Sequence, residues 1–346
     1  MKSKLRLIGL LTISCLLIAC QKSDTNPQNT QSKNAETLKA VENDAQKKLK
    51  AKCQSVDLKI KALANKSSPK KLSDLNHLLQ LCIAEVPLEK RYQWIKDSEQ
   101  VYQNLLEKSS IEFYQYMTNS TGDHEELTAQ AKKALYAELK PEEQYLVDHA
   151  KALYLEKYYL GEGEYTVVQH PQYYIDLFVP HLEKADQVYF KQLRKEYTGS
   201  DYILDAGLAI SFDEVKNRLI FWENYLKNYP KAHYQSQVAE LIKNYKNDLF
   251  HGHENTRTLW FDHDKIADQD ALKAIRKLAA SDSASHKTAQ AFLNLITSSE
   301  AQWQQLPKSS EDEAEYDSAE QKDIREQRQI LQKQVETEVD AILNKS

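Results

Sequence analysis

Turn-forming residues are scarce in this chain, and this scarcity restricts the folds that are open to it. Only 7 glycines and 8 prolines occur among 346 residues, whereas a β-sandwich or barrel of this length needs many more tight turns. Apolar residues instead recur every three or four positions along most segments, which is typical of helices with one buried face. With 20 tyrosines, 8 phenylalanines and 4 tryptophans available for a core, whole-chain disorder is excluded. We therefore predict an all-α protein.

The N-terminus has the features of a targeting segment. Three basic residues within the first six are followed by an uncharged, almost wholly apolar stretch at 7–19, which is too short for a stable membrane span of about 20 residues. It ends in Leu17-Ile18-Ala19-Cys20, which resembles the lipobox of bacterial lipoproteins. The resemblance implies cleavage before Cys20, a diacylglyceryl group on its sulfur and a further acyl chain on its amine. The alternative is an uncleaved signal anchor that ends in an ordinary cysteine.

The residue after Cys20 and the charge of the mature chain bear on its location and partners. Gln21 stands where an aspartate marks retention in the inner membrane of enteric bacteria, so the same resemblance implies the outer membrane, with the body in the periplasm and surface exposure left open. Removal of 1–19 takes the formal charge from −5 to −8, which disfavours binding to nucleic acid or to anionic lipid. The expected contacts are thus the membrane, through the lipid, and an envelope protein.

The remaining chain is divided by composition and by two further cysteines. We expect a flexible tether at 20–34, a helical hairpin region at 35–118, a helical body at 119–305, and an acidic linker with an amphipathic helix at 306–346. Cys53 and Cys82 lie at equal distances from a turn at 65–69, where Ser68 and Pro69 begin the second helix. We predict a disulfide between them, worth about 3–4 kcal/mol; the alternative is two buried thiols.

Residues 211–250 resemble a tetratricopeptide hairpin of the kind found in periplasmic lipoproteins of outer-membrane assembly. The matching residues are Trp222, Tyr225, Leu226, Tyr229 and Pro230. Leu226 and Val238 occupy positions where that family has small residues, and no second copy follows at a 34-residue period. We therefore expect an irregular, tetratricopeptide-like helical solenoid or bundle.

The sequence also predicts the structure of two other segments, residues 141–169 and the C-terminal amphipathic helix. We expect a helix from Pro141 to Leu160, followed by a loop or short strand up to Gln169, where Glu162, Glu164 and His170 could line a cleft. The apolar stripe of the C-terminal helix either packs on the body or forms a coiled-coil seam with a partner.

The sequence offers one candidate metal centre and no catalytic motif. His251, His253, Asp262 and His263 are ligand types at loose spacing; the alternative is a helix end at Gly252 followed by a solvated loop. The zincin, nucleophile-elbow and phosphate-loop patterns are all absent from the sequence. We therefore predict no catalytic residue, no cofactor and no enzyme, with a metal-binding or hydrolytic enzyme as the alternative.

Tyrosine provides the other candidate surface. Nineteen of the twenty tyrosines fall between Tyr92 and Tyr245, and such a concentration is typical of binding surfaces or of loosely packed helices. The expected function is a non-enzymatic adaptor, assembly factor or scaffold of the envelope; a peptidoglycan-binding or lysozyme-inhibitor-type module is the other alternative. A partner groove would use Tyr158, Tyr159, Tyr173, Tyr174 and Trp222.

Overall fold

The computed structural model describes residues 44, 46–65, 68–120, 126–161, 163–199, 201–262, 264–308 and 318–345. The predicted signal segment, the lipid site Cys20 and the tether lie outside these residues. The chain divides into two units, Met1–Leu49 and Lys50–Ser346, and the second contains every element from α2 onward. None of the helices in the described stretches has the length and apolarity that crossing a membrane requires. The fold is all-α, and in the described residues the strands form short antiparallel hairpins beside the helices.

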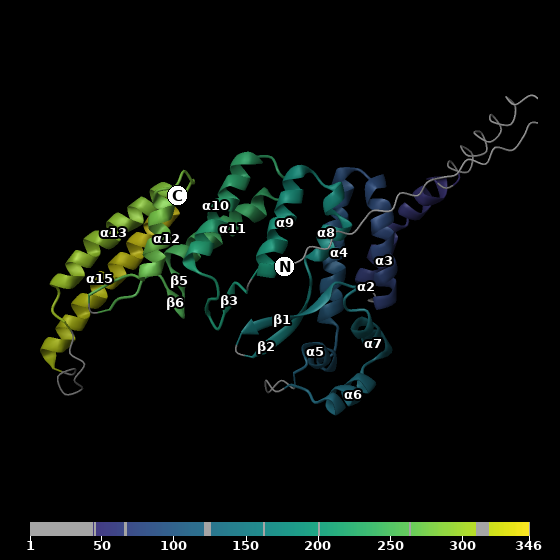
Figure 1. The fold of residues 1–346 in the computed structure, drawn as a ribbon, viewed down its shortest axis with the longest axis horizontal. Coiled ribbons are helices and arrows are strands. Elements are labelled where there is room, and N and C mark those ends of the chain that lie inside the picture. The colour runs from purple at the N-terminus through teal and green to yellow at the C-terminus, as the bar shows by residue number, and fades with distance from the viewer. Residues whose placement is uncertain are drawn as a thin grey trace, which may run out of the picture. The chain divides into compact units, whose positions relative to one another are not determined.

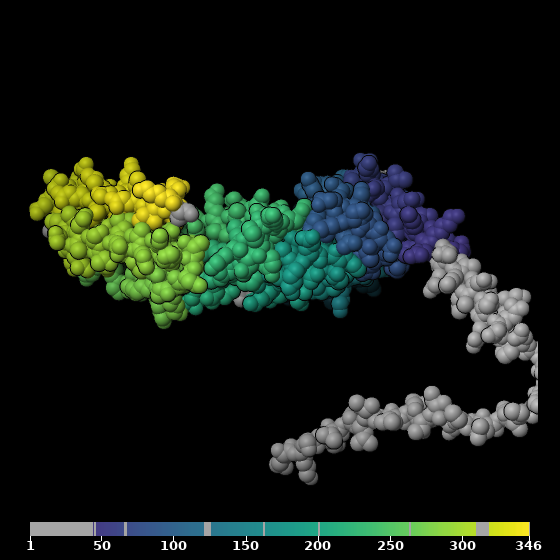
Figure 2. Space-filling view, turned by 90° about the horizontal axis from the view of Figure 1, so that it is seen from above, coloured from purple at the N-terminus to yellow at the C-terminus, as the bar shows by residue number. Residues whose placement is uncertain are grey.

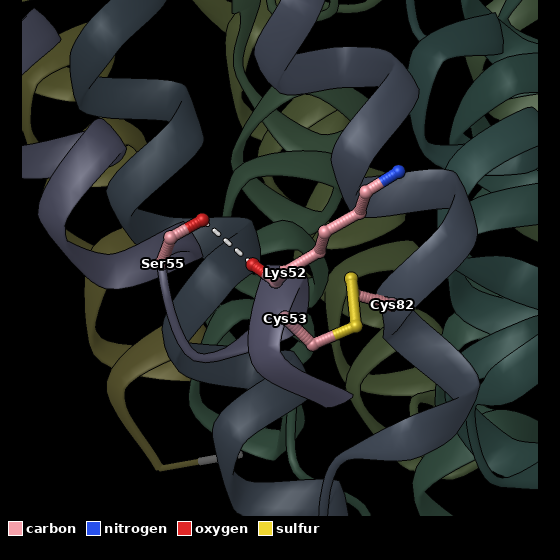
Figure 3. Close-up of a disulfide and its surroundings, with 4 residues drawn as sticks. All are labelled: Lys52, Cys53, Ser55 and Cys82. Carbon is pink, nitrogen blue, oxygen red and sulfur yellow. Dashed lines mark hydrogen bonds between the residues drawn. A yellow bond between two sulfur atoms is a disulfide. The ribbon is translucent and has the colours of Figure 1, made fainter. Parts of the chain in front are cut away.

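A disulfide joins the segment just before helix α2 to the end of the next helix, α3. α2 spans Val56–Asn65 and α3 spans Pro69–Cys82, with Ser68 as an extended N-cap residue and proline in the first turn. Cys53 and Cys82 are buried and bonded, with Cα atoms 5.3 Å apart (Figure 3), which confirms the predicted bridge. The helix expected to run through Cys53 is interrupted immediately after it. There, the Ser55 hydroxyl donates to the Lys52 carbonyl at 2.6 Å, a local bond that competes with helical pairing.

Four more helices complete the N-terminal part of this unit. A 3-10 turn at Ile83–Glu85 leads into them, and α2 packs on both α3 and α4. Ser110 and Thr128 cap α5 and α6, because each side chain accepts a bond from the backbone N–H three residues later. Their bounds are Leu88–Glu107 (α4), Ile111–Thr118 (α5), Ala129–Glu138 (α6) and Pro141–Asp148 (α7).

From Leu155 the chain contains three copies of one structural repeat, which is a β-hairpin followed by helical segments (Figure 1). The hairpins begin at Leu155, Ile203 and Gly252, so the repeat recurs every 48 to 49 residues. The first repeat holds β1 (Leu155–Gly161), β2 (Glu164–Gln169), α8 (Gln172–Leu177), a 3-10 turn (Val179–His181) and α9 (Lys184–Gly199). The second repeat holds β3 (Ile203–Leu204), β4 (Gly207–Leu208), α10 (Phe212–Asn228) and α11 (Gln235–Phe250). The third repeat holds β5 (Gly252–His253), β6 (Thr256–Arg257), α12 (Gln269–Ala279) and α13 (His286–Gln305).

Neighbouring hairpins touch through glycines. β1 contacts β3, and β4 contacts β5. A Cβ atom on Gly161 would lie 2.9 Å from the Asp205 nitrogen, and one on Gly207 would lie 2.8 Å from the Thr256 hydroxyl oxygen. The Asn255 N–H also donates to the Ala206 carbonyl at 3.1 Å. A glycine thus lets each hairpin approach the tip of the next.

The structure corrects the prediction for residues 141–161. The expected helix ends at Asp148, and residues 155–161 form β1 instead. The reason is pairing: residues 155–161 find an antiparallel partner in β2, across a turn where Gly161 and Gly163 both have positive φ. The short strand expected before Gln169 is present as β2. The hairpins β3–β4 and β5–β6 were not predicted.

The C-terminal helix α15 (Ala319–Asn344) packs on the body of the protein. It contacts α13 and α11, and Figure 2 shows it in yellow against the yellow-green helices. The predicted stripe is buried at Ile324, Leu331, Val335 and Val339. Since these side chains are covered from within the chain, they are not a free coiled-coil seam.

Candidate functional site

Those predicted metal ligands that the structure describes, His251, His253 and Asp262, have separate partners. His251 Nε2 lies 3.0 Å from Asp340 Oδ1 of α15, while His253 Nε2 lies 3.1 Å from Asp248 Oδ1 of α11. The backbone carbonyl of Asp262 accepts a bond from the Trp303 indole at 2.6 Å. His263 lies outside the described residues. Within the part of the chain that the structure describes, no group of three or more potential ligands could hold an ion. The side chains of His251 and His253 therefore each pair with a separate carboxylate.

The predicted tyrosine groove is also corrected. Tyr173 and Trp222 are both 0% exposed and so cannot line an open surface. Packing explains their burial: Tyr173 meets Tyr102 edge-on with ring centroids 5.2 Å apart, and the Trp222 indole donates to Glu196 Oε1 at 3.0 Å. Large aromatic side chains fill the space between helices that cross without close backbone contact.

The other three residues of that prediction are half-buried and belong to different contacts. Tyr174 stacks on Phe190 with ring centroids 4.9 Å apart. Tyr158 and Tyr159, on β1, stack or tilt against Tyr197 of α9 and Tyr165 of β2. The five residues therefore form no common groove.

Many tyrosine hydroxyls are instead paired with carboxylates that are distant in the sequence. Tyr245 donates to Glu196 at 2.7 Å and Tyr154 donates to Asp176 at 3.1 Å. The same kind of bond fastens hairpins to helices, because Tyr197 of α9 donates to Glu156 of β1. Pairs of this kind include Tyr92–Asp186, Tyr136–Asp148, Tyr154–Asp176, Tyr197–Glu156, Tyr202–Asp248 and Tyr245–Glu196.

Burial, together with these pairs, keeps the phenols protonated. Burial, together with the neighbouring Asp176 carboxylate, raises the pKa of Tyr154 to about 12. Burial is also the main reason that the pKa of Tyr245 lies well above its usual value, with the Glu196 charge adding to it. A phenol with a raised pKa is a poor nucleophile and a poor base at neutral pH. The paired tyrosines therefore act as structural donors.

A cavity of about 1020 Å³ opens where the chain passes from α7 through β1 to α8. Tyr154 forms part of its wall, with a backbone φ of 56°, a left-handed conformation that is costly for a bulky side chain. The 13 residues that line it include Met117, Ala150, Ala152 and Leu155 as apolar members.

Charged side chains of both signs surround this cavity. Asp176 accepts from Tyr154 and, at 2.7 Å, from the Gln172 amide. Glu156 accepts from Tyr197 and lies 3.8 Å from His170 Nε2. Lys151 and Lys157 are also part of the lining. The cavity therefore combines an apolar and aromatic lining with a small number of polar groups, which is the usual composition of a binding site.

Sequence reasoning anticipated only part of this cavity. His170 was expected to line a cleft and does so. Glu164 is exposed on β2 and is not part of the lining, and Glu162 lies outside the described residues. The rest depends on the left-handed backbone at Tyr154, for which the sequence has no signal because neither glycine nor asparagine stands there.

Comparison with known proteins supplies no relative. No family model matches the chain, and no curated protein or solved structure is significantly similar to it.

Proposed function

We propose that this protein is a lipid-anchored adaptor of the bacterial outer membrane, facing the periplasm, which holds a polypeptide segment of an envelope partner in the cavity at Tyr154. The lipobox-like Leu17-Ile18-Ala19-Cys20 supports the anchor. Acyl chains contribute about 0.8 kcal/mol for each buried CH₂ group, which is enough for stable attachment when several are present.

The observation that carries the proposal is the left-handed Tyr154 in the wall of an open, mixed-charge cavity. Such a backbone costs roughly 1–3 kcal/mol and persists only where its surroundings impose it. Here the Tyr154 carbonyl accepts from the His170 N–H at 2.6 Å, while its hydroxyl donates to Asp176. Strain retained beside a cavity favours a binding role for that cavity.

The lining indicates which ligand class suits the cavity. Carboxylates, ammonium groups and imidazoles line the cavity together with apolar side chains, so both signs of charge are present. A polypeptide segment with apolar side chains and both signs of charge is complementary to such a surface. Nucleic acid is disfavoured because the three carboxylates Asp148, Glu156 and Asp176 outnumber the two lysines.

Site-specific photocrosslinking in intact cells tests this function. A photoreactive amino acid at Ala152, in the cavity lining, should capture a discrete envelope protein. The same group at the exposed Lys287 of α13 is the control and should not capture it. No adduct from Ala152, or the same adducts from both positions, would count against an adaptor cavity.

The anchor is tested separately by Cys20→Ser. This substitution removes the acyl acceptor and should move the protein from the membrane fraction to the soluble periplasmic fraction. Mass spectrometry of the wild-type chain should find residue 20 at the N-terminus, carrying lipid. A wild-type chain that retains residues 1–19 would refute the anchor but would leave the cavity result interpretable.

A further inference from the structure

One tryptophan is placed differently from the others. Trp260 is 59% exposed, whereas Trp94, Trp222 and Trp303 are buried. Its backbone is nevertheless well held, because its N–H donates to the Ile266 carbonyl at 3.0 Å. The preceding residue, Leu259, is buried and forms a bridge with Ala267.

The loop that carries Trp260 is also fastened to α13. The Trp303 indole donates to the Asp262 carbonyl at 2.6 Å, and the Gln304 amide donates to the Asp264 carbonyl at 3.0 Å. The adjacent Phe261 packs on Trp303, with ring centroids 5.2 Å apart. An exposed indole on such a fixed support marks a contact surface, because an amphipathic ring costs little entropy to immobilise there.

A cavity of about 610 Å³ lies beside this ring. Its size falls within the roughly 300–1,000 Å³ that is usual for small-ligand sites. One side is the hairpin β5–β6, another is the aromatic pair Trp260 and Phe261, and the third is α15. The α15 residues are Gln332, Glu336 and Asp340, which are four positions apart and thus share one helical face.

The polar groups of this cavity are planar and arranged for recognition. The Gln332 amide donates to Glu336 at 2.9 Å, and Asp340 is held by His251 at 3.0 Å. The Arg257 guanidinium donates to the Glu254 carbonyl at 3.2 Å. These contacts orient amide, carboxylate and guanidinium planes that can each bond two neighbouring hydroxyls.

The charged residues that line this cavity restrict the class of ligand that it can bind. Glu254, Glu336 and Asp340 give three carboxylates against the single guanidinium of Arg257, so phosphate groups and acidic chains would be repelled. A neutral sugar satisfies both features of the cavity: its C–H face packs on an aromatic ring, and its hydroxyls bond to planar polar side chains.

We propose that this cavity binds a neutral oligosaccharide, with the Trp260 indole as the stacking platform. The proposal does not depend on the adaptor function, since the Tyr154 cavity shares no lining residue with this one. It would give a membrane-anchored chain a second contact, to glycan.

Tryptophan fluorescence of the purified full chain tests the proposal directly. Because the other three indoles are buried, iodide should quench mainly Trp260. Titration with an N-acetylglucosamine tetramer should protect that fluorescence in a saturable manner. Binding measured by calorimetry should fall at least tenfold in Trp260→Ala and less in Trp260→Phe, which keeps an aromatic face.

The matched control is Ile330→Ala. Ile330 lies on α15, is 61% exposed and is not part of the cavity lining, so its removal should leave sugar affinity unchanged. Circular dichroism should show wild-type helicity in all three variants. The proposal is overturned if the tetramer gives no saturable protection, or if Trp260→Ala binds it as well as the wild type does.

A cationic ligand is the competing occupant, because an indole among carboxylates also attracts ammonium groups. A lysine-rich peptide serves as the second probe. If that peptide binds with strong salt dependence while the neutral tetramer does not bind, the saccharide proposal is wrong.

Discussion

Glu196 illustrates how single polar residues hold this protein together. It is buried on α9, and its carboxylate accepts from the Trp222 indole at 3.0 Å and from the Tyr245 hydroxyl at 2.7 Å. It thereby joins α9 of the first repeat to α10 and α11 of the second repeat. Since a buried donor without a partner costs about 1–3 kcal/mol, the two bonds make Glu196 one of the residues on which the stability of the array depends.

We expect Glu196→Ala to lower the free energy of unfolding by about 2–4 kcal/mol, because it leaves two buried donors unpaired. Urea denaturation followed by circular dichroism measures the change. Lys195→Ala, at the exposed neighbouring position, is the control and should change stability by less than about 0.5 kcal/mol. Equal stability of both variants would mean that the two bonds contribute nothing.

The buried phenols predict a loss of stability in alkali. The pKa values of Tyr154 and Tyr189 are both raised to about 12, with burial as the largest cause. A folded-state pKa above the unfolded value of about 10 gives stability that is complete below pH 10 and is lost as the pH rises towards 12. Tyrosinate absorbance should therefore rise together with unfolding, and Tyr154→Phe should reduce the alkaline loss. Ionisation of all tyrosines before any loss of helicity would contradict this.

Among the elements, the hairpins were the hardest to predict from the sequence. Asp205 and Ala206 form a two-residue turn with positive φ at both positions, where glycine or asparagine is usual, so the sequence has no hairpin signal there. The helices could be predicted because proline, capping residues and apolar stripes mark them. Ser211, for example, is a typical capping residue, and it accepts a bond from the Glu214 N–H. The disulfide was predictable from the equal distances of Cys53 and Cys82 from their turn.

Two glycines offer a matched test of hairpin stacking. Gly207→Ala places a methyl group 2.8 Å from the Thr256 hydroxyl oxygen and 3.2 Å from the Asn255 Cβ, and should cost about 1–3 kcal/mol through overpacking. Gly199→Ala meets nothing within 4 Å and should be neutral or slightly stabilising. Thermal denaturation compares them. A Gly207→Ala variant as stable as Gly199→Ala would show that the hairpins do not need close contact.

The two candidate cavities were harder to predict from the sequence than the fold was. The metal prediction grouped His251 and His253 by proximity along the chain, but their partners Asp340 and Asp248 come from two different helices. The tyrosine prediction could not separate rings that fill the core from rings on the surface, because composition does not distinguish them. The Trp260 cavity depends on contacts between the distant segments 251–261 and 332–340, and the Tyr154 cavity depends on a local backbone conformation; one sequence reveals neither.

At the scale of the whole molecule, α15 completes the final repeat unit. Val339 is fully buried on this helix, and Val339→Asp would place an unpaired carboxylate in that contact, at a cost of about 3 kcal/mol or more. We expect α15 to become sensitive to limited proteolysis. The exposed Thr337→Asp is the control. Protection of α15 in Val339→Asp equal to that in the control would show that its docking tolerates a buried charge.

The contact of each hairpin with the tip of the next restricts how such a protein can change in length. An insertion within one turn would displace the neighbouring tip from its glycine, so the defect would be passed along the row. Gain or loss of the complete middle repeat would keep each tip opposite Gly161 or Gly207. Evolution would therefore lengthen or shorten this protein by duplicating or deleting entire modules.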